Sequence, residues 1–129
     1  MKKLTCHCGE VEAEVKLPEN GFETLARCNC SICKRKGYVM TAVNPENFKI
    51  IKGQDLLTLY QYHTKVAEHY FCSKCGIYTH SNPRSNHDKI YMINVACIEG
   101  INEKTNLSLW LSRSRSKIAR KGIWKTYKM

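Results

Sequence analysis

The sequence predicts a mainly β protein of short antiparallel strands organised around metal-binding cysteine clusters. Short runs rich in β-branched and aromatic residues alternate with turn residues, which is the pattern of antiparallel sheets. Residues 10 to 15 alternate polar and apolar side chains, as a half-buried strand does. Eight cysteines in 129 residues are many, and most of them have ligand spacing. The length and the 43% hydrophobic composition fit a single globular domain over residues 1 to 129.

The predicted strands follow one another with short connections. They cover residues 10–15, 22–27, 38–43, 48–52, 56–62, 65–71, 77–80 and 89–95. Proline, asparagine and glycine residues predict turns at 18–21, 44–47 and 81–86. Residues 34–37, Lys-Arg-Lys-Gly, are interpreted as a short basic turn.

Three cysteines within six residues form the first ligand motif. Cys28 and Cys30 are two residues apart, so their sulfurs point to one face of an extended segment. Cys30 and Cys33 have the C-x-x-C spacing of a tight turn that chelates one ion. Three sulfurs on one zinc would leave its fourth position open, as in catalytic zinc sites. The alternatives are a redox pair formed by Cys30 and Cys33 and a cysteine-rich patch that merely oxidises.

Two further cysteine pairs predict a closed site. Cys72 and Cys75 stand in C-x-x-C-G, a zinc knuckle that presents two sulfurs from one turn. Cys6 and Cys8 form a C-x-C-G pair that supplies two more. Together the pairs complete a four-cysteine structural site that ties the N-terminus to the middle of the chain.

The remaining candidate ligands carry no pattern. Cys97 stands alone and is expected to be a small buried apolar residue. The histidines His63, His69, His80 and His87 are scattered without ligand spacing, so none is selected as a fourth ligand of the three-cysteine site.

The chain is basic, with a formal charge of +10. Seven thiolates would remove seven charges and two zinc ions would restore four, which leaves +7. Such a protein favours anionic partners, either small acidic molecules or nucleic acid. No apolar segment follows the basic N-terminus and no run approaches the length of a membrane span, so a cytoplasmic protein that does not enter membranes is predicted.

The segment from about residue 104 to residue 129 contains no acidic residue. Its basic run begins near Arg113 and interleaves with Trp110, Trp124 and Tyr127. One interpretation is a charged surface or frayed end. The other is an arm that binds nucleic acid or another polyanion.

Three motifs in this order resemble the glutathione-dependent formaldehyde-activating enzyme (GFA) family, which shares a domain with centromere protein V. They are C-x-C-G at residues 6–9, C-N-C-S-x-C at 28–33 and F-C-x-x-C-G at 71–76, and the resemblance covers about residues 4 to 100. It implies an Mss4-like β-tent fold of coiled antiparallel sheets around zinc. It also implies a structural zinc on Cys6, Cys8, Cys72 and Cys75, and a catalytic, often labile zinc on Cys28, Cys30 and Cys33. The Lys/Arg-rich tail departs from the acidic, Trp-containing ends of many members.

The resemblance further implies a carbon–sulfur lyase that adds glutathione to formaldehyde, or joins a related thiol and aldehyde. Zinc would lower the pKa of the incoming thiol or polarise the aldehyde oxygen, and three thiolate ligands favour thiol binding. Lys34, Arg35 and Lys36 are candidate contacts for the substrate carboxylates. The alternative hypothesis is a non-catalytic zinc module whose basic tail binds nucleic acid or an acidic partner; a thiol redox protein ranks third.

Overall fold

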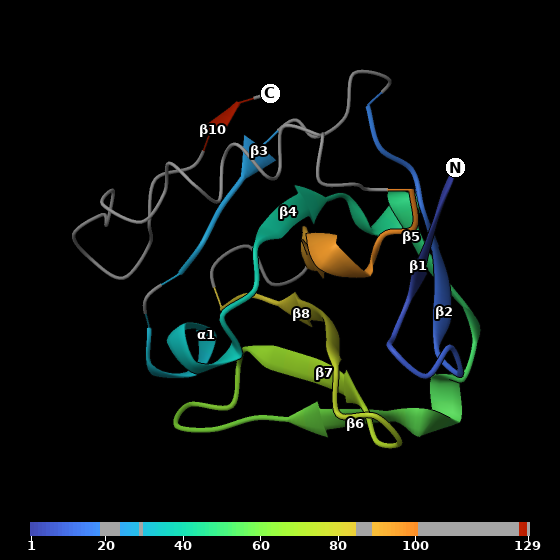
Figure 1. Cartoon of the computed structure of the whole chain (residues 1–129). Helices are drawn as coiled ribbons and strands as arrows, with labels where there is room; N and C mark the ends of the chain where they lie inside the picture. The colour runs from blue at the N-terminus through green and yellow to red at the C-terminus, as the bar shows by residue number, and fades with distance from the viewer. Residues whose placement is uncertain (19–23, 29, 85–88, 101–126, 129) are drawn as a thin grey trace.

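The computed structural model describes residues 1–18, 24–28, 30–84, 89–100 and 127–128. Ten short strands form a three-stranded sheet, a five-stranded sheet and a two-stranded pair, and every pairing is antiparallel (Figure 1). The predicted mainly β, antiparallel fold is therefore confirmed. No helix in these described ranges is long and apolar enough to cross a membrane.

The three-stranded sheet has the order β1-β2-β5, with β1 at Lys2–Thr5, β2 at Glu12–Val15 and β5 at Phe48–Lys52. Ala13 and Val15 of β2 are fully buried whereas Glu14 is exposed, as the alternating sequence predicts. Strand β1 was not predicted, because Leu4 alone provides its buried side chain between charged and polar neighbours. It forms because its backbone pairs with β2 along its whole length.

The five-stranded sheet has the order β4-β9-β8-β7-β6. Its strands are β4 at Met40–Val43, β6 at Leu57–Tyr60, β7 at Glu68–Cys72, β8 at Tyr78–Asn82 and β9 at Tyr91–Asn94. Residues 81 and 82, predicted to begin a loop, instead continue β8. Ser81 pairs with Met92 and Asn82 with Glu68, so a central position in the sheet satisfies the backbone of these polar residues.

The one α-helix among the described residues, α1 at Ser31–Lys36, replaces the predicted basic turn. It ends at Gly37, which adopts the left-handed conformation and donates its backbone N–H to the carbonyl of Cys33. Lysine and arginine are good helix formers and suit the end of a helix, where the dipole is negative. Three 3₁₀ helices, η1 at Pro45–Asn47, η2 at Gln54–Leu56 and η3 at Val95–Cys97, form connections.

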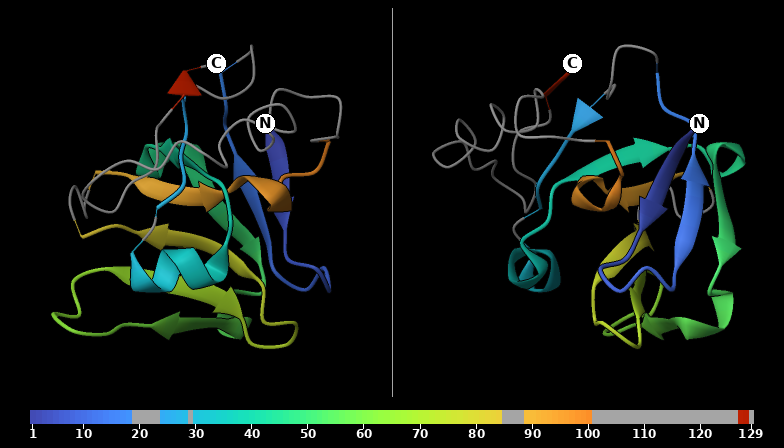
Figure 2. Two further views of the ribbon diagram at one scale, coloured as in Figure 1. Left: turned by 60° about the vertical axis from the view of Figure 1, so that its left-hand side comes forward. Right: turned by 45° about the vertical axis from the view of Figure 1, so that its right-hand side comes forward.

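The core lies between the two larger sheets, which cross each other in the views of Figure 2. Its buried side chains come from β1, β2, β4, β9 and the segment of β3 at Thr24–Leu25, which pairs with β10 at Tyr127–Lys128. Strand β7 runs between α1 and the loop that connects β1 to β2, so these two cysteine-bearing segments lie at its opposite ends (Figure 1).

His80 is buried among aromatic rings at the centre of the five-stranded sheet. It stacks on Tyr70 with ring centroids 4.7 Å apart, contacts Phe48 at the same separation, and is only 4% exposed. Burial, helped by the charge of Lys36, lowers the pKa of His80 from 6.5 to about 3. The folded protein therefore holds a neutral imidazole that the unfolded chain would protonate below pH 6.5.

Replacement of His80 by Phe is expected to make stability less sensitive to acid. A lowered histidine pKa contributes stability that is present above pH 6.5 and is lost as the pH falls towards the folded value. Between pH 7 and pH 5 the loss of unfolding free energy should be smaller in the variant by about 2 kcal/mol. Denaturant titrations at both pH values measure this. The exposed His63, replaced by Asn, should retain the wild-type loss; an equal loss in the His80 variant would contradict the prediction.

Candidate metal centres

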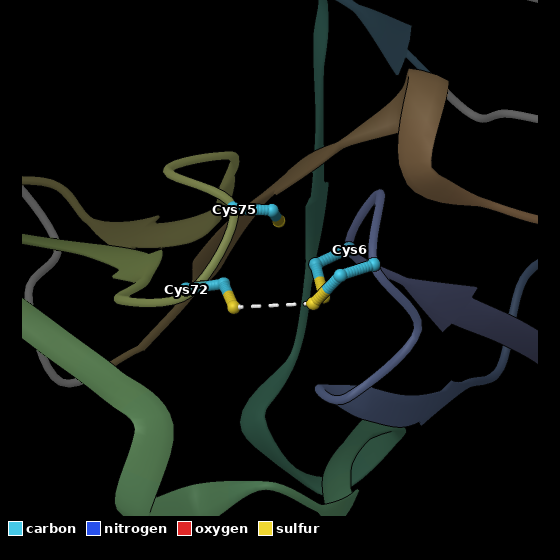
Figure 3. A group of neighbouring side chains, drawn as sticks. Cys6, Cys72 and Cys75 are labelled. Carbon is cyan, nitrogen blue, oxygen red and sulfur yellow. Dashed lines mark hydrogen bonds between the residues drawn. The ribbon is translucent and has the colours of Figure 1, made fainter.

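The first cluster joins Cys6 and Cys8, from the loop between β1 and β2, to Cys72 and Cys75, from the turn between β7 and β8. Figure 3 shows Cys6 on one segment and Cys72 and Cys75 on the other, with their side chains directed into the gap between the two segments. All four Sγ atoms lie within 4.8 Å of one another, with 3.5 Å between Cys6 and Cys8 and 3.8 Å between Cys8 and Cys72. A disulfide needs about 2.05 Å. Sulfurs on a tetrahedral ion with bonds of about 2.3 Å lie about 3.8 Å apart, so this cluster fits a closed metal site.

Backbone hydrogen bonds hold both halves of the four-cysteine cluster in matching turns. The N–H of Val11 donates to Cys6 Sγ at 3.3 Å. Gly9 and Gly76 each adopt a left-handed conformation and donate their N–H groups to the carbonyls of Cys6 and Cys72. The glycine that follows each cysteine pair in the sequence therefore allows the chain to reverse around the sulfurs.

The second cluster groups Cys28, Cys30 and Cys33, whose Sγ atoms also lie within 4.8 Å of one another. Cys30 is the N-cap residue of α1 and Cys33 lies inside the helix. Cys28 lies two residues after Ala26. The backbone of Ala26 pairs with that of Met40 in β4, and this pairing fixes the segment before the helix. Within the described ranges, no other cysteine, histidine or acidic side chain joins this group.

The environment of the three-cysteine cluster favours a thiolate at Cys28. A hydrogen bond from the Cys33 thiol, the backbone N–H of Cys30 at 3.5 Å and the charge of Lys36 lower the pKa of Cys28 to about 5. The same hydrogen bond and burial raise the pKa of Cys33. The cluster therefore carries negative charge near neutral pH, as a metal ligand set must.

The three basic residues after Cys33 take different positions. Lys34 is exposed. Arg35 is also exposed and donates to the carbonyl of Ser31 at 2.7 Å. Lys36 turns inward, because residues three apart on a helix share a face and Cys33 lies on the same face. Its ammonium donates to the Tyr38 hydroxyl at 3.0 Å and to Nδ1 of His69 at 3.1 Å.

A pocket of about 540 Å³ adjoins the three-cysteine cluster. Its lining consists of helix residues and three tyrosines, namely Ser31, Ile32, Arg35, Lys36, Tyr60, Tyr62 and Tyr78. Tyr62 stacks on Tyr60 with ring centroids 5.9 Å apart and on His69 with ring centroids 6.1 Å apart. The lining contains two cations and no acidic side chain, so the pocket suits an anionic ligand with planar groups.

The sequence did not identify the residues that complete this pocket. They are Tyr60 of β6, Tyr62 of the loop after it and Tyr78 of β8, which only the sheet topology brings beside α1. The same topology brings His69 of β7 to Lys36. The abundance of tyrosine between residues 60 and 78 was the one available signal.

The other candidates lie apart from both clusters or outside the described ranges. Cys97 is buried in η3, where its thiol donates to the carbonyl of Tyr78 at 3.7 Å, as expected of a small core residue. His80 is buried, His63 is exposed, and His87 lies outside the described residues. The proposed basic arm also lies outside them, apart from Tyr127–Lys128.

Comparison with known proteins places these clusters in a family. The family model described as glutathione-dependent formaldehyde-activating enzyme matches residues 1–113. A crystal structure of a Rhodobacter sphaeroides protein is 47% identical, covers 78% of this chain and 90% of its own, and superposes with a TM-score of 0.72. The family-model match extends over both cysteine clusters and confirms the resemblance seen in the sequence. The chain therefore belongs to the glutathione-dependent formaldehyde-activating enzyme family.

Proposed function

We propose that this protein is a zinc-dependent carbon–sulfur lyase that joins, or separates, a glutathione-like thiol and a formaldehyde-like aldehyde. The observation that carries the proposal is the convergence of three cysteine sulfurs beside a cationic, tyrosine-walled pocket. Three protein ligands leave one position of a tetrahedral ion for a substrate. Family membership supports the reaction class.

The four-cysteine cluster is assigned the structural zinc. Cys6, Cys8, Cys72 and Cys75 would fill all four positions of a tetrahedral ion, so nothing remains for a substrate. The role fits its location, since it ties the loop after β1 to the end of β7.

The three-cysteine cluster is assigned the catalytic zinc, held by Cys28, Cys30 and Cys33. Such an ion would lower the pKa of a substrate thiol bound to it, so that the thiolate is available near neutral pH. The chain supplies the rest: Arg35 and Lys36 attract the anionic substrate, and Tyr60, Tyr62 and Tyr78 enclose it. The thiolate sulfur bonds to the carbonyl carbon, the π pair moves to oxygen, and the oxygen takes a proton.

Elemental analysis combined with rate measurements tests this proposal. Protein purified under reducing conditions without chelator should contain two zinc ions per chain, and a mild chelator should remove one of them while the fold persists. The intact protein should accelerate adduct formation between glutathione and formaldehyde, followed by NMR, above the uncatalysed rate, and the chelated protein should not. One zinc per chain that does not increase on adding zinc, or no acceleration across thiol–aldehyde pairs, would contradict it.

A further inference from the structure

Lys36 is the basic residue of α1 that turns inward, and its ammonium makes its direct contacts with neutral groups. Its Nζ atom lies 4.4 Å from the ring centroid of Tyr38 and 4.8 Å from that of Tyr78, besides donating to the Tyr38 hydroxyl and His69. Tyr38 and His69 are themselves buried. Because the ammonium donates to Nδ1 of His69, that ring is the neutral form protonated at Nε2. The ammonium is therefore fixed by two neutral acceptors and two aromatic faces.

Its neighbours do not include a carboxylate. In the part of the chain that the structure describes, the ionisable groups whose charge acts on Lys36 are the cysteines of the cluster, Cys33, Cys30 and Cys28. Enclosing a cation is costly, and the sulfurs beside this one are those that a metal ion would bind, so an anion from the pocket would complete the arrangement. Lys36 also lines the pocket beside the cluster, so an anion that enters there meets its ammonium.

The three N–H groups of the Lys36 ammonium differ in their partners. A lysine ammonium has three N–H groups. Two donate to Tyr38 and His69, and among the residues that the structure describes the third meets no oxygen, nitrogen or sulfur acceptor but only the aromatic faces of Tyr38 and Tyr78, which are weaker partners than an anion. Arg35 differs, because it is exposed and occupied with the carbonyl of Ser31.

We propose that Lys36 is a catalytic residue whose third N–H donates to the reacting anionic atom of the substrate, whereas Arg35 contacts the distant carboxylates. The assignment rests on the proposed function. Lys36 would donate first to the thiolate sulfur and then to the aldehyde oxygen as negative charge moves there. The sequence predicted that Lys34, Arg35 and Lys36 would all contact substrate carboxylates, whereas the proposal gives Lys36 a contact with the reacting atom.

The step balances without a redox partner. The thiol loses its proton to solvent. A sulfur lone pair forms the C–S bond while the carbonyl π pair moves to oxygen, which then takes a proton from solvent. Lys36 keeps its three protons throughout and acts by hydrogen bonding and charge, as an oxyanion-hole donor does.

Calorimetric binding of two ligands to the zinc-loaded protein tests the assignment. Glutathione and S-methylglutathione have the same carboxylates, but only glutathione can present a thiolate. The wild type should prefer glutathione. Replacing Lys36 by Gln should reduce that preference about tenfold or more, whereas the affinity for S-methylglutathione should fall much less, because that ligand loses only the general attraction of the positive charge. The exposed Lys16, replaced by Gln, loses the same charge and should keep the preference.

A second variant separates this role from a structural one. Replacing Tyr38 by Phe removes one anchor of the ammonium and keeps its charge, so the preference and kcat should fall by less than in the Lys36 variant. Thermal melts and zinc content should match the wild type in each variant. A wild type without preference for glutathione, or a Lys36 variant that retains preference and kcat, overturns the assignment. If the preference follows Lys36 but no thiol–aldehyde pair is accelerated, the proposed reaction and the catalytic role fail together, and only the hydrogen bond from Lys36 to a bound thiolate stands.

Discussion

Replacement of Cys72 by Ser is expected to leave the chain largely unfolded at room temperature. Cys72 is 0% exposed, ends β7, and lies 3.8 Å from Cys8 across the four-cysteine cluster. Structural zinc contributes on the order of 10 kcal/mol of apparent binding free energy in small domains, which is comparable to the whole stability of a domain. Loss of one of four thiolates removes most of that contribution and buries a hydroxyl without an ion.

Circular dichroism melts and zinc content measure this effect. The matched control is Cys97→Ser, which changes another buried cysteine that lies outside both clusters. Its hydroxyl can donate to the carbonyl of Tyr78 as the thiol does, so a cost of only about 1 kcal/mol is expected. A Cys72 variant that melts like the Cys97 control and retains the tightly held zinc would show that the four-cysteine cluster is not a structural metal site.

Replacement of Cys30 by Ser is expected to abolish turnover while the fold is retained. Loss of groups that merely support a metal ligand already costs up to about a hundredfold in activity, so loss of the ligand itself should cost at least that much. The fold should persist because Cys30 is the N-cap residue of α1, a position that serine favours.

The adduct-formation rate, the melting temperature and the zinc content decide this second case. We expect one zinc ion per chain, an unchanged or slightly higher melting temperature, and no rate above background. The Cys97 control should keep its turnover. If the Cys30 variant turns over at the wild-type rate, the three-cysteine cluster is not the reacting site.

The sequence predicted those features that depend on local pattern. Strand β5 matches its predicted bounds, because turn residues delimit it on both sides. The cysteines were grouped into a set of four and a set of three from their spacing, and the structure brings together the same sets. Ligand spacing is a property of a few adjacent residues, so it can be recognised without knowledge of the topology.

Features decided by tertiary contacts escaped prediction. Strand β1 has one buried side chain and depends on pairing with β2. Helix α1 has six residues, too few to display helical periodicity. Lys36 turns inward and Lys34 is exposed because they lie on different faces of this helix, which the sequence alone does not show. The tyrosines of the pocket lie beside the cysteines because β6, β7 and β8 are neighbours in one sheet.

The placement of the two clusters at opposite ends of β7 means that each would be filled separately. The sulfurs form two separate groups, and a metal–sulfur bond is only about 2.3 Å long, so an ion held by one group is not bound by the other. Two independent exchange equilibria follow, and with them an intermediate that carries one ion in the four-cysteine cluster. That one-ion form would melt like the complete protein and yet be inactive. The fraction of active molecules would therefore depend on the supply of metal and not on the amount of folded chain.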